Sequence, residues 1–309
     1  AQVVANPYDP EYGKLAGEVA TTDTRVSEFN KFHFRMQNFM PRLRKRDGTI
    51  VGIESSTPRL TLTGPLIRDR VAFTQSFEYR YVRTPVETLP PLQRDTGVES
   101  FDSYTQVDLS LTERQNASIT LSFYPQKLKY LGLNTFTPQP ATPDLRQRGH
   151  FLALSHKFVS QSGALLASQI SFKEFDADLK PHSDELYRLG VETTTGGFFN
   201  RQDRDTERLE WQEVFTPSAV IGWGRHQPKV GFHFVRNVFD GQTTFRPVEV
   251  LRASGRVAER IDFTPAATTS IRQREYTAFV LDKWTIHPRV TIDAGLRLDR
   301  DSISDEGHV

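Results

Sequence analysis

The stretch Val71-Ala72-Phe73-Thr74-Gln75-Ser76-Phe77-Glu78-Tyr79-Arg80-Tyr81 decides the fold of this chain. Most of its odd positions are apolar or aromatic, whereas most of its even positions carry hydroxyl or charged groups. A period of two indicates an extended strand with one apolar and one polar face. Strands of soluble proteins usually run for about five or six residues, whereas a tilted strand needs roughly nine to eleven to cross a bilayer. The length of the stretch therefore suits a strand that spans a membrane.

Similar segments recur to the end of the chain, and they predict about eleven antiparallel strands. Short and long links alternate between these segments. We expect one strand in each of residues 29–40, 59–64, 70–82, 101–111, 117–123, 208–215, 229–237, 274–284 and 290–298, and two in a hairpin over 148–175.

The lengths of the links favour a barrel over a soluble β-sandwich. Tight turns on one side and long loops on the other are typical of a transmembrane β-barrel, and a sandwich has no reason to sort its loops in this way. Hydrophobic alternation alone does not separate the two folds. We expect tight turns at 66–69, 112–116, 160–163 and 285–289, and long links at 41–57, 83–99, 125–147, 176–205 and 240–272, the last with its own hairpin around 253–255.

Composition excludes several other classes. The 309 residues are 37% hydrophobic with a mean hydropathy of −0.50, and no run of about 18 apolar residues predicts a membrane helix. A polar-lined barrel remains compatible, because only alternate residues of its strands contact lipid. The net charge is +1 without a basic face, which argues against nucleic acid as a partner. The absence of cysteine excludes disulfides and thiol nucleophiles.

No motif predicts catalysis or a resident metal. The eight histidines show no metal-ligand spacing, and no Gly-x-Ser-x-Gly segment occurs. Asp203, Asp205, Glu207 and Glu210 form an acidic group at the base of a long link, where oxygen ligands could bind Ca²⁺. A solvated loop face is the simpler interpretation of this group. We therefore expect no enzymatic activity, no cofactor and no metal site.

Three segments resemble one family in the order in which the family carries them. Residues 8–19 (YDPEYGKLAGEV) resemble the last plug strand of TonB-dependent outer-membrane receptors. Residues 64–73 (GPLIRDRVAF) resemble a hairpin of the carboxypeptidase-regulatory-like members of that family, and 276–284 with 294–299 resemble a hairpin in the middle of the barrel. The resemblance implies that 1–26 form the C-terminal end of a plug domain. It implies that 27–309 form the N-terminal part of a larger barrel, since an odd number of strands would leave unpaired edges.

The resemblance implies a place in the outer membrane of a Gram-negative bacterium and energy-coupled uptake of a siderophore, vitamin, glycan or peptide fragment. The expected partners are outer-membrane lipid, a polar small-molecule or oligomeric nutrient, and the TonB complex, the last through a region upstream of these residues. The alternative is a soluble or surface-attached all-β protein that binds carbohydrate through exposed aromatic side chains.

The parity of charged residues predicts which side chains face the lumen. A cationic side chain that faces lipid at mid-bilayer costs about 2–4 kcal/mol, so the charged parity should point inward. Lumen-facing candidates are Glu78, Arg80, Gln106, Asp108, Asp293 and Arg297, while lipid-facing candidates are Phe73, Phe77, Val107, Leu109, Ile119, Leu121, Val290, Ile292 and Leu296. Both parities of 276–284 are apolar, so its facing stays open.

Two further expectations concern aromatic residues. Aromatic side chains gather towards the segment ends, where a barrel places girdles at the two membrane interfaces; plain core packing is the alternative. In the long polar links, Phe198, Phe199 and Phe245 are candidates for stacking on a ligand, and purely solvated loops are the alternative.

Overall fold

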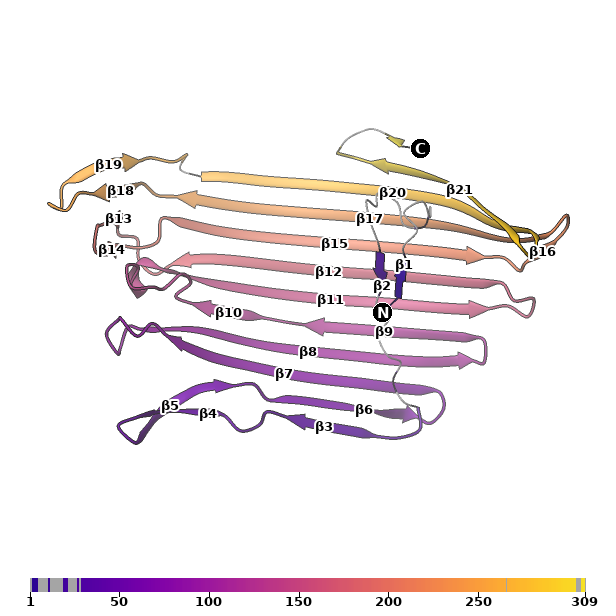
Figure 1. Cartoon of the computed structure of the whole chain (residues 1–309), viewed down its shortest axis with the longest axis horizontal. Helices are drawn as coiled ribbons and strands as arrows, with labels where there is room; N and C mark the ends of the chain where they lie inside the picture. The colour runs from indigo at the N-terminus through magenta and orange to yellow at the C-terminus, as the bar shows by residue number, and fades with distance from the viewer. Residues whose placement is uncertain are drawn as a thin grey trace.

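One curved antiparallel sheet dominates the computed structural model (Figure 1), which describes residues 2–4, 11, 19–21, 27, 29–264, 266–303 and 307–308. The sheet contains sixteen strands. Its members are β3 (His33–Gln37), β4 (Arg42–Arg46), β5 (Thr49–Ser56), β6 (Arg59–Ile67), β7 (Val71–Pro85), β8 (Asp95–Thr112), β9 (Gln115–Phe123), β10 (Gln126–Lys129), β11 (Pro143–Val159), β12 (Leu165–Pro181), β15 (Asn200–Thr216), β16 (Val220–Ile221), β17 (Arg225–Phe245), β20 (Ala266–His287), β21 (Val290–Asp301) and β22 (Gly307–His308).

The order across the sheet follows the order along the chain. Strand β3 pairs with β6 and β4 pairs with β5, so β3 and β4 together form one strand position and β5 and β6 form the next. In the same way, β9 and β10 together occupy the position between β8 and β11. With these broken strands joined and the short β16 and β22 set aside, eleven positions cross the sheet. The predicted antiparallel barrel architecture with about eleven strands is confirmed.

The tight turns gather at one end of the sheet, here called the turn end. Figure 1 shows the turns after β6, β8, β11, β15 and β20 at its right, and the longer links at its left, which we call the loop end. The four links predicted as tight therefore lie at the turn end and the predicted long links at the loop end, although the first of these long links closes in a tight turn between β4 and β5 at the loop end. The positive φ of Asp69 (60°) and Gly163 (85°) shows the tight backbone that these turns require.

The predicted extents of the long links were wrong, because the strands continue beyond the apolar stretches. Strand β12 runs to Pro181 and β15 starts at Asn200, so much of 176–205 is paired backbone. The expected link 41–57 contains the hairpin of β4 and β5, which turns at Asp47-Gly48 with φ of 49° and 79°. Residues 200–207 contain no apolar side chain, so hydrophobic alternation could not reveal this part of β15. Residues 176–181 do alternate, with Ala177 and Leu179 between charged residues, and this signal was missed.

A second, four-stranded sheet joins the loops at the loop end. Its order is β14 (Thr194–Thr195), β13 (Tyr187–Leu189), β18 (Val248–Leu251) and β19 (Val257–Ile261). Strands β18 and β19 form the hairpin expected around 253–255, and β13 pairs with β18 in parallel. The 3-10 helix η2 (Gln139–Ala141) adds the fully buried Ala141 to a small core beneath this loop sheet.

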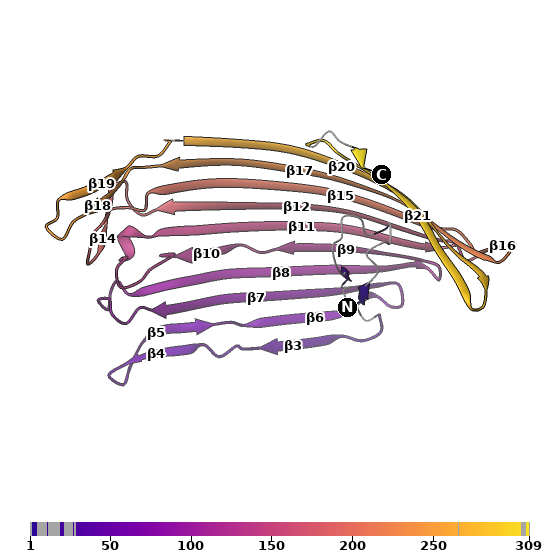
Figure 2. The ribbon, with the colours of Figure 1, turned by 45° about the horizontal axis from the view of Figure 1, so that its top comes forward.

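A separate antiparallel pair, β1 (Gln2–Val4) with β2 (Val19–Thr21), lies over the main sheet and not at its edge (Figures 1 and 2). Among the described residues, no helix is long and apolar enough to cross a membrane. The placement of these N-terminal residues over one face gives the two faces of the main sheet different surroundings.

Candidate functional site

The register separates the side chains of the main sheet into an apolar and a polar face. Thr74 lies opposite Gln106, and Gln106 lies opposite Thr120, whereas Phe73 is aligned with Val107 and Val107 with Ile119. The same alternation continues strand by strand to β21. We call the side with Gln106 the polar face and the side with Val107 the apolar face.

A buried hydrogen-bonded group on the polar face holds one N-terminal residue. The Gln106 and Asp108 side chains are 3% and 5% exposed. Gln106 Nε2 donates to the two carboxylate oxygens of Asp108 at 2.8 and 2.9 Å, and the Tyr104 hydroxyl donates to Gln106. The Ser27 backbone N–H donates to Asp108 Oδ2 at 2.7 Å, and its hydroxyl lies 2.9 Å from that of Thr74. A buried carboxylate needs such donors, so Asp108 fixes residue 27 against the sheet.

A second contact on the polar face holds Glu11. Lys229 Nζ lies 2.6 Å from Glu11 Oε2, and Arg297 Nη1 donates to the Glu11 carbonyl oxygen at 3.2 Å. Arg297 Nε also donates to Asp299 at 2.7 Å, which orients its guanidinium. Charge-assisted hydrogen bonds of this kind are stronger than neutral ones. Strands β17 and β21 thus bind a residue that is far away in the sequence.

All six lumen-facing candidates lie on the polar face. Gln106, Asp108 and Arg297 take part in the contacts to Ser27 and Glu11 described above. Glu78 accepts a hydrogen bond from Arg59 at 2.8 Å on the neighbouring strand. Arg80 and Asp293 are exposed on the same face.

The strand whose facing the sequence left open, β20, is also resolved by the register. Its Thr277 and Phe279 are buried on the polar face, and Tyr276 and Val280 point to the apolar face. Thr277 lies opposite His233, whose Nε2 is 2.7 Å from Glu210 on β15. Lys229, His233 and Thr277 were not among the predicted lumen-facing residues, although their parity within β17 and β20 is the signal that identifies them.

The proposed acidic group at the base of a link is divided between the two faces. Asp203, Asp205 and Glu207 lie on the apolar-face side of β15, above its apolar part, whereas Glu210 points to the polar face. The expected loop is therefore a strand here, and the alternation of a strand separates the carboxylates. Within the described ranges, no three His, Asp or Glu side chains are arranged to hold a metal ion.

The three aromatic residues proposed for ligand stacking pack within the loop end instead of standing free. Phe198 and Phe199 lie 5.9 and 5.6 Å from the ring of buried Tyr187, between ring centroids, and 4.9 Å from each other. Phe245 stacks on Phe263 at 5.4 Å. Burial also raises the pKa of Tyr187 above its ordinary value. These rings therefore support the loop sheet, and their role towards a ligand stays a prediction.

The apolar face exposes large side chains and carries aromatic rings towards both ends of its apolar band. Phe77 stacks on Phe101 at 6.0 Å on the side of the loop end, and His226 stacks on Trp284 at 5.2 Å on the side of the turn end. A soluble sheet would cover such a face. Members of the exposed band include Leu121, Leu152, Leu154, Ile170, Phe172, Trp211, Val230, Tyr276, Val280, Ile292, Leu296 and Leu298.

Comparisons with known proteins agree with this geometry. Solved structures that resemble the chain include the outer membrane transporter YddB from Escherichia coli, with a TM-score of 0.68 and 13% identity over 99% of this chain and 43% of that one. The siderophore receptor PirA from Acinetobacter baumannii gives 0.58 and 17% over 97% and 43%. A mutant of the ferric enterobactin receptor PfeA from Pseudomonas aeruginosa gives 0.58 and 15% over 97% and 44%.

These likenesses show the fold, and the chain spans less than half the length of each of these solved receptors. A comparison with curated protein sequences found no match. The sequence profile described as "TonB dependent receptor-like, beta-barrel" matches residues 92–308, which is more than half of the chain. The chain therefore belongs to the TonB-dependent receptor-like β-barrel family of the bacterial outer membrane, a family of receptors and transporters and not of enzymes.

Proposed function

We propose that the chain is part of an outer-membrane receptor that takes up a scarce polar nutrient by energy coupling to the TonB complex. In this proposal the polar face lines the lumen of a larger closed barrel and the apolar face contacts lipid. The turn end faces the periplasm and the loop end faces the outside, as short periplasmic turns and long external loops imply. The nutrient classes considered are siderophores, vitamins, glycans and peptide fragments.

One observation carries the proposal: residues near the N-terminus are fixed to the polar face and not to a sheet edge. Ser27 bonds to the buried Asp108, and Glu11 bonds to Lys229 and Arg297. A segment that occupies the lumen must satisfy the polar groups of the wall, which these contacts do. They support assigning residues 1–26 to the end of a plug domain and 27–309 to the barrel.

The loop end suits capture of a polar ligand. The loop sheet rises beyond the barrel strands and has its own small core, so it offers a rigid platform for exposed polar side chains. Ion pairs hold this platform together, as Arg188 Nε donates to Glu249 at 2.9 Å across β13 and β18. PirA is a siderophore receptor and PfeA a ferric enterobactin receptor, which makes ferric siderophores the first compounds to test for this chain.

The test uses the full-length gene in a strain that lacks it. Uptake of labelled ferric siderophores, cobalamin, oligosaccharides and peptides is measured with and without functional TonB. We expect one class to accumulate only when both the receptor and TonB are present. The proposal would be contradicted if accumulation did not depend on TonB, or if none of these compounds accumulated.

The alternative of a soluble carbohydrate-binding protein has less support. It requires exposed aromatic residues in a water-facing site, but the exposed aromatics of the main sheet lie within a continuous apolar band. A detergent-free, monodisperse preparation of the chain would favour it.

A further inference from the structure

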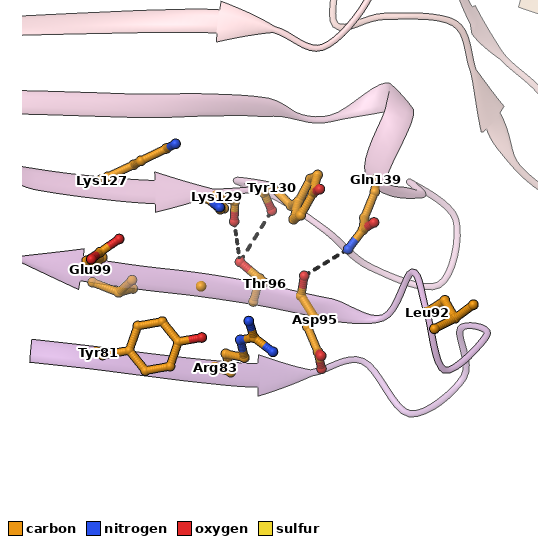
Figure 3. Close-up of a pocket in the computed structure, with 12 residues that line it drawn as sticks. Tyr81, Arg83, Leu92, Asp95, Thr96, Glu99, Lys127, Lys129, Tyr130 and Gln139 are labelled. Carbon is orange, nitrogen blue, oxygen red and sulfur yellow. Dashed lines mark hydrogen bonds between the residues drawn. The ribbon is translucent and has the colours of Figure 1, made fainter. Parts of the chain in front are cut away.

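Two neighbouring hollows lie near the loop end of β7, β8, β10 and β11. Their volumes are about 260 and 480 Å³, and they share Glu99 and Lys127. Figure 3 shows the smaller one, with Tyr81 and Arg83 on β7 and with Lys127 and Lys129 on β10 at the other side of β8. The register places Tyr81, Arg83, Glu99 and Lys127 on the same side as the apolar face. The larger hollow extends this surface over β11 and β12.

The hollows contain cations without anionic partners. Arg83, Lys129 and Arg146 are exposed and form no ion pair within the described part of the chain, although Arg83 lies over the Tyr81 ring at 5.5 Å. Lys127 is only weakly paired, at 4.0 Å from Asp144. We call Arg83, Lys127, Lys129 and Arg146 the outer basic cluster.

The carboxylates that line the hollows are already occupied. Glu99 accepts a hydrogen bond from the Tyr79 hydroxyl at 2.9 Å. Arg148 Nε donates to Asp176 at 3.0 Å, and Lys180 pairs with Asp178. Asp95 pairs with Arg44, whereas the partner of Glu99 is a neutral hydroxyl, so Glu99 keeps its charge. The six Lys and Arg residues that line the two hollows outnumber the four Asp and Glu residues, so the net charge of the hollows is positive.

A glycine opens the space between two of these cations. Gly97 lies opposite Arg83 on one neighbouring strand and opposite Lys129 on the other. Adjacent strands are about 4.8 Å apart, so the backbones at Arg83 and Lys129 lie about 10 Å from each other. No side chain stands between them, because the residue in the middle is glycine. An added Cβ at Gly97 would meet only the Val82 carbonyl oxygen, at 3.8 Å. The gap is therefore open and can accept a group from outside.

The position of the cluster indicates where that group comes from. Phe77, Tyr79 and Phe101 form the aromatic edge of the apolar band directly below it, and aromatic girdles lie at the level of lipid headgroups. Cationic side chains just beyond such an edge meet the headgroups themselves. Arginine binds phosphate through two parallel hydrogen bonds, and lysine binds it as a point charge.

We propose that the outer basic cluster binds the phosphorylated headgroup of an outer-leaflet glycolipid, with Gly97 leaving room for a phosphate between Arg83 and Lys129. The inference depends on the outer-membrane location of the sheet, and it is independent of which nutrient is taken up. A receptor that fails to bind this lipid can still transport, and a receptor without transport can still bind the lipid.

The test measures binding of bisphosphorylated lipid A to the purified full-length receptor in detergent, by native mass spectrometry. The variant Arg83→Ala/Lys129→Ala/Arg146→Ala should bind it at least about tenfold more weakly, because each juxtamembrane cation contributes to attraction by anionic lipid. Gly97→Leu should weaken binding several-fold, at about the level of one lost cation, while it keeps every charge. Heat-modifiable migration on gels shows that each variant folds.

The matched control is Arg201→Ala/Arg236→Ala/Arg274→Ala, which removes three exposed arginines from the same side of the sheet outside the hollows. It should leave specific binding unchanged. An equal loss in the control would mean general charge attraction and would overturn the proposal. Undiminished binding of dephosphorylated lipid, or binding of inorganic phosphate as tight as that of lipid A, would overturn it as well.

Discussion

The two faces of the main sheet are stabilised in different ways. The polar face holds its neighbours through directional contacts, as Asp108 does with Ser27 and Lys229 with Glu11. The apolar face offers side chains such as Leu296, 51% exposed, that make no specific contact and require only an apolar medium. In a soluble β-protein the apolar side chains form the interior and the polar ones face the surroundings, and the main sheet shows the opposite arrangement. The polar face should therefore depend on individual residues, and the apolar face only on hydrophobicity.

The largest expected effect contrasts adjacent residues of β9 on opposite faces. Ile119→Arg places a cation on the apolar face between the turn end and Phe123, and should lower the free energy of unfolding by about 2–4 kcal/mol. Thr120→Arg makes the same change on the polar face and should cost well under half as much. Urea unfolding of the full-length receptor in lipid vesicles measures both. Equal losses would mean that the two faces do not differ in their surroundings.

A glycine on the polar face should be the next most sensitive position. Gly231 lies beneath the buried Phe279 ring, and an added Cβ would come within 2.2 Å of it. Gly231→Val forces this ring to move, so we expect a loss of about 1–3 kcal/mol from overpacking. Gly97→Val, which enters open space, is the control and should change stability by less than about 0.5 kcal/mol. The same unfolding assay compares the two.

Removing the Glu11 contact tests how the polar face holds the N-terminal segment. Lys229→Ala/Arg297→Ala removes charge-assisted contacts worth about 1–3 kcal/mol, and should raise passage of a large excluded antibiotic into cells several-fold. Lys283→Ala removes an exposed cation from the same face and should have no effect. Unchanged permeability of the double variant would show that these contacts are not needed to keep the lumen closed.

The smallest effect concerns charges above the apolar band. Burial, with added repulsion from Glu174, raises the pKa of Asp205, so its ionised form destabilises the folded state at neutral pH. Asp205→Asn should raise stability at pH 7 by up to about 0.5 kcal/mol, and the gain should vanish below the ordinary pKa of about 4, where aspartate is protonated in both states. Thermal unfolding at a series of pH values measures this.

Asp240, which lies opposite Asp205, is the control of opposite sign. Hydrogen bonds from Arg272 lower its pKa, so its contribution to stability is present at neutral pH and is lost as pH falls through the folded-state pKa. Asp240→Asn should therefore lower stability at pH 7. A shift of the same sign in both variants would contradict these assignments.

The sequence predicted the strands, the division of their side chains between two faces and the sorting of most links well, because these features depend on local alternation and on turns. The faces of Phe73 and Thr74 can be assigned from their places in the local alternation, without information on the strands that pair with theirs. The Asp108 parity was visible in the same way, although its bond to Ser27, 81 residues away, was not. The packing of Phe198 and Phe199 on Tyr187 was missed for the same reason, since β13 and β18, with three and four residues, are too short to show a period. Contacts between distant segments are fixed by tertiary structure, which alternation does not encode.

The parallel pairing of β13 with β18 has a mechanical consequence. The loop that carries β13 is rooted in β12 and β15, and the loop that carries β18 is rooted in β17 and β20. The backbone hydrogen bonds between β13 and β18 and the Arg188–Glu249 ion pair join the two loops into one unit, which is attached to the main sheet at four strands. A molecule that displaces either loop must tilt both, and the tilt reaches four adjacent strands of the wall at once.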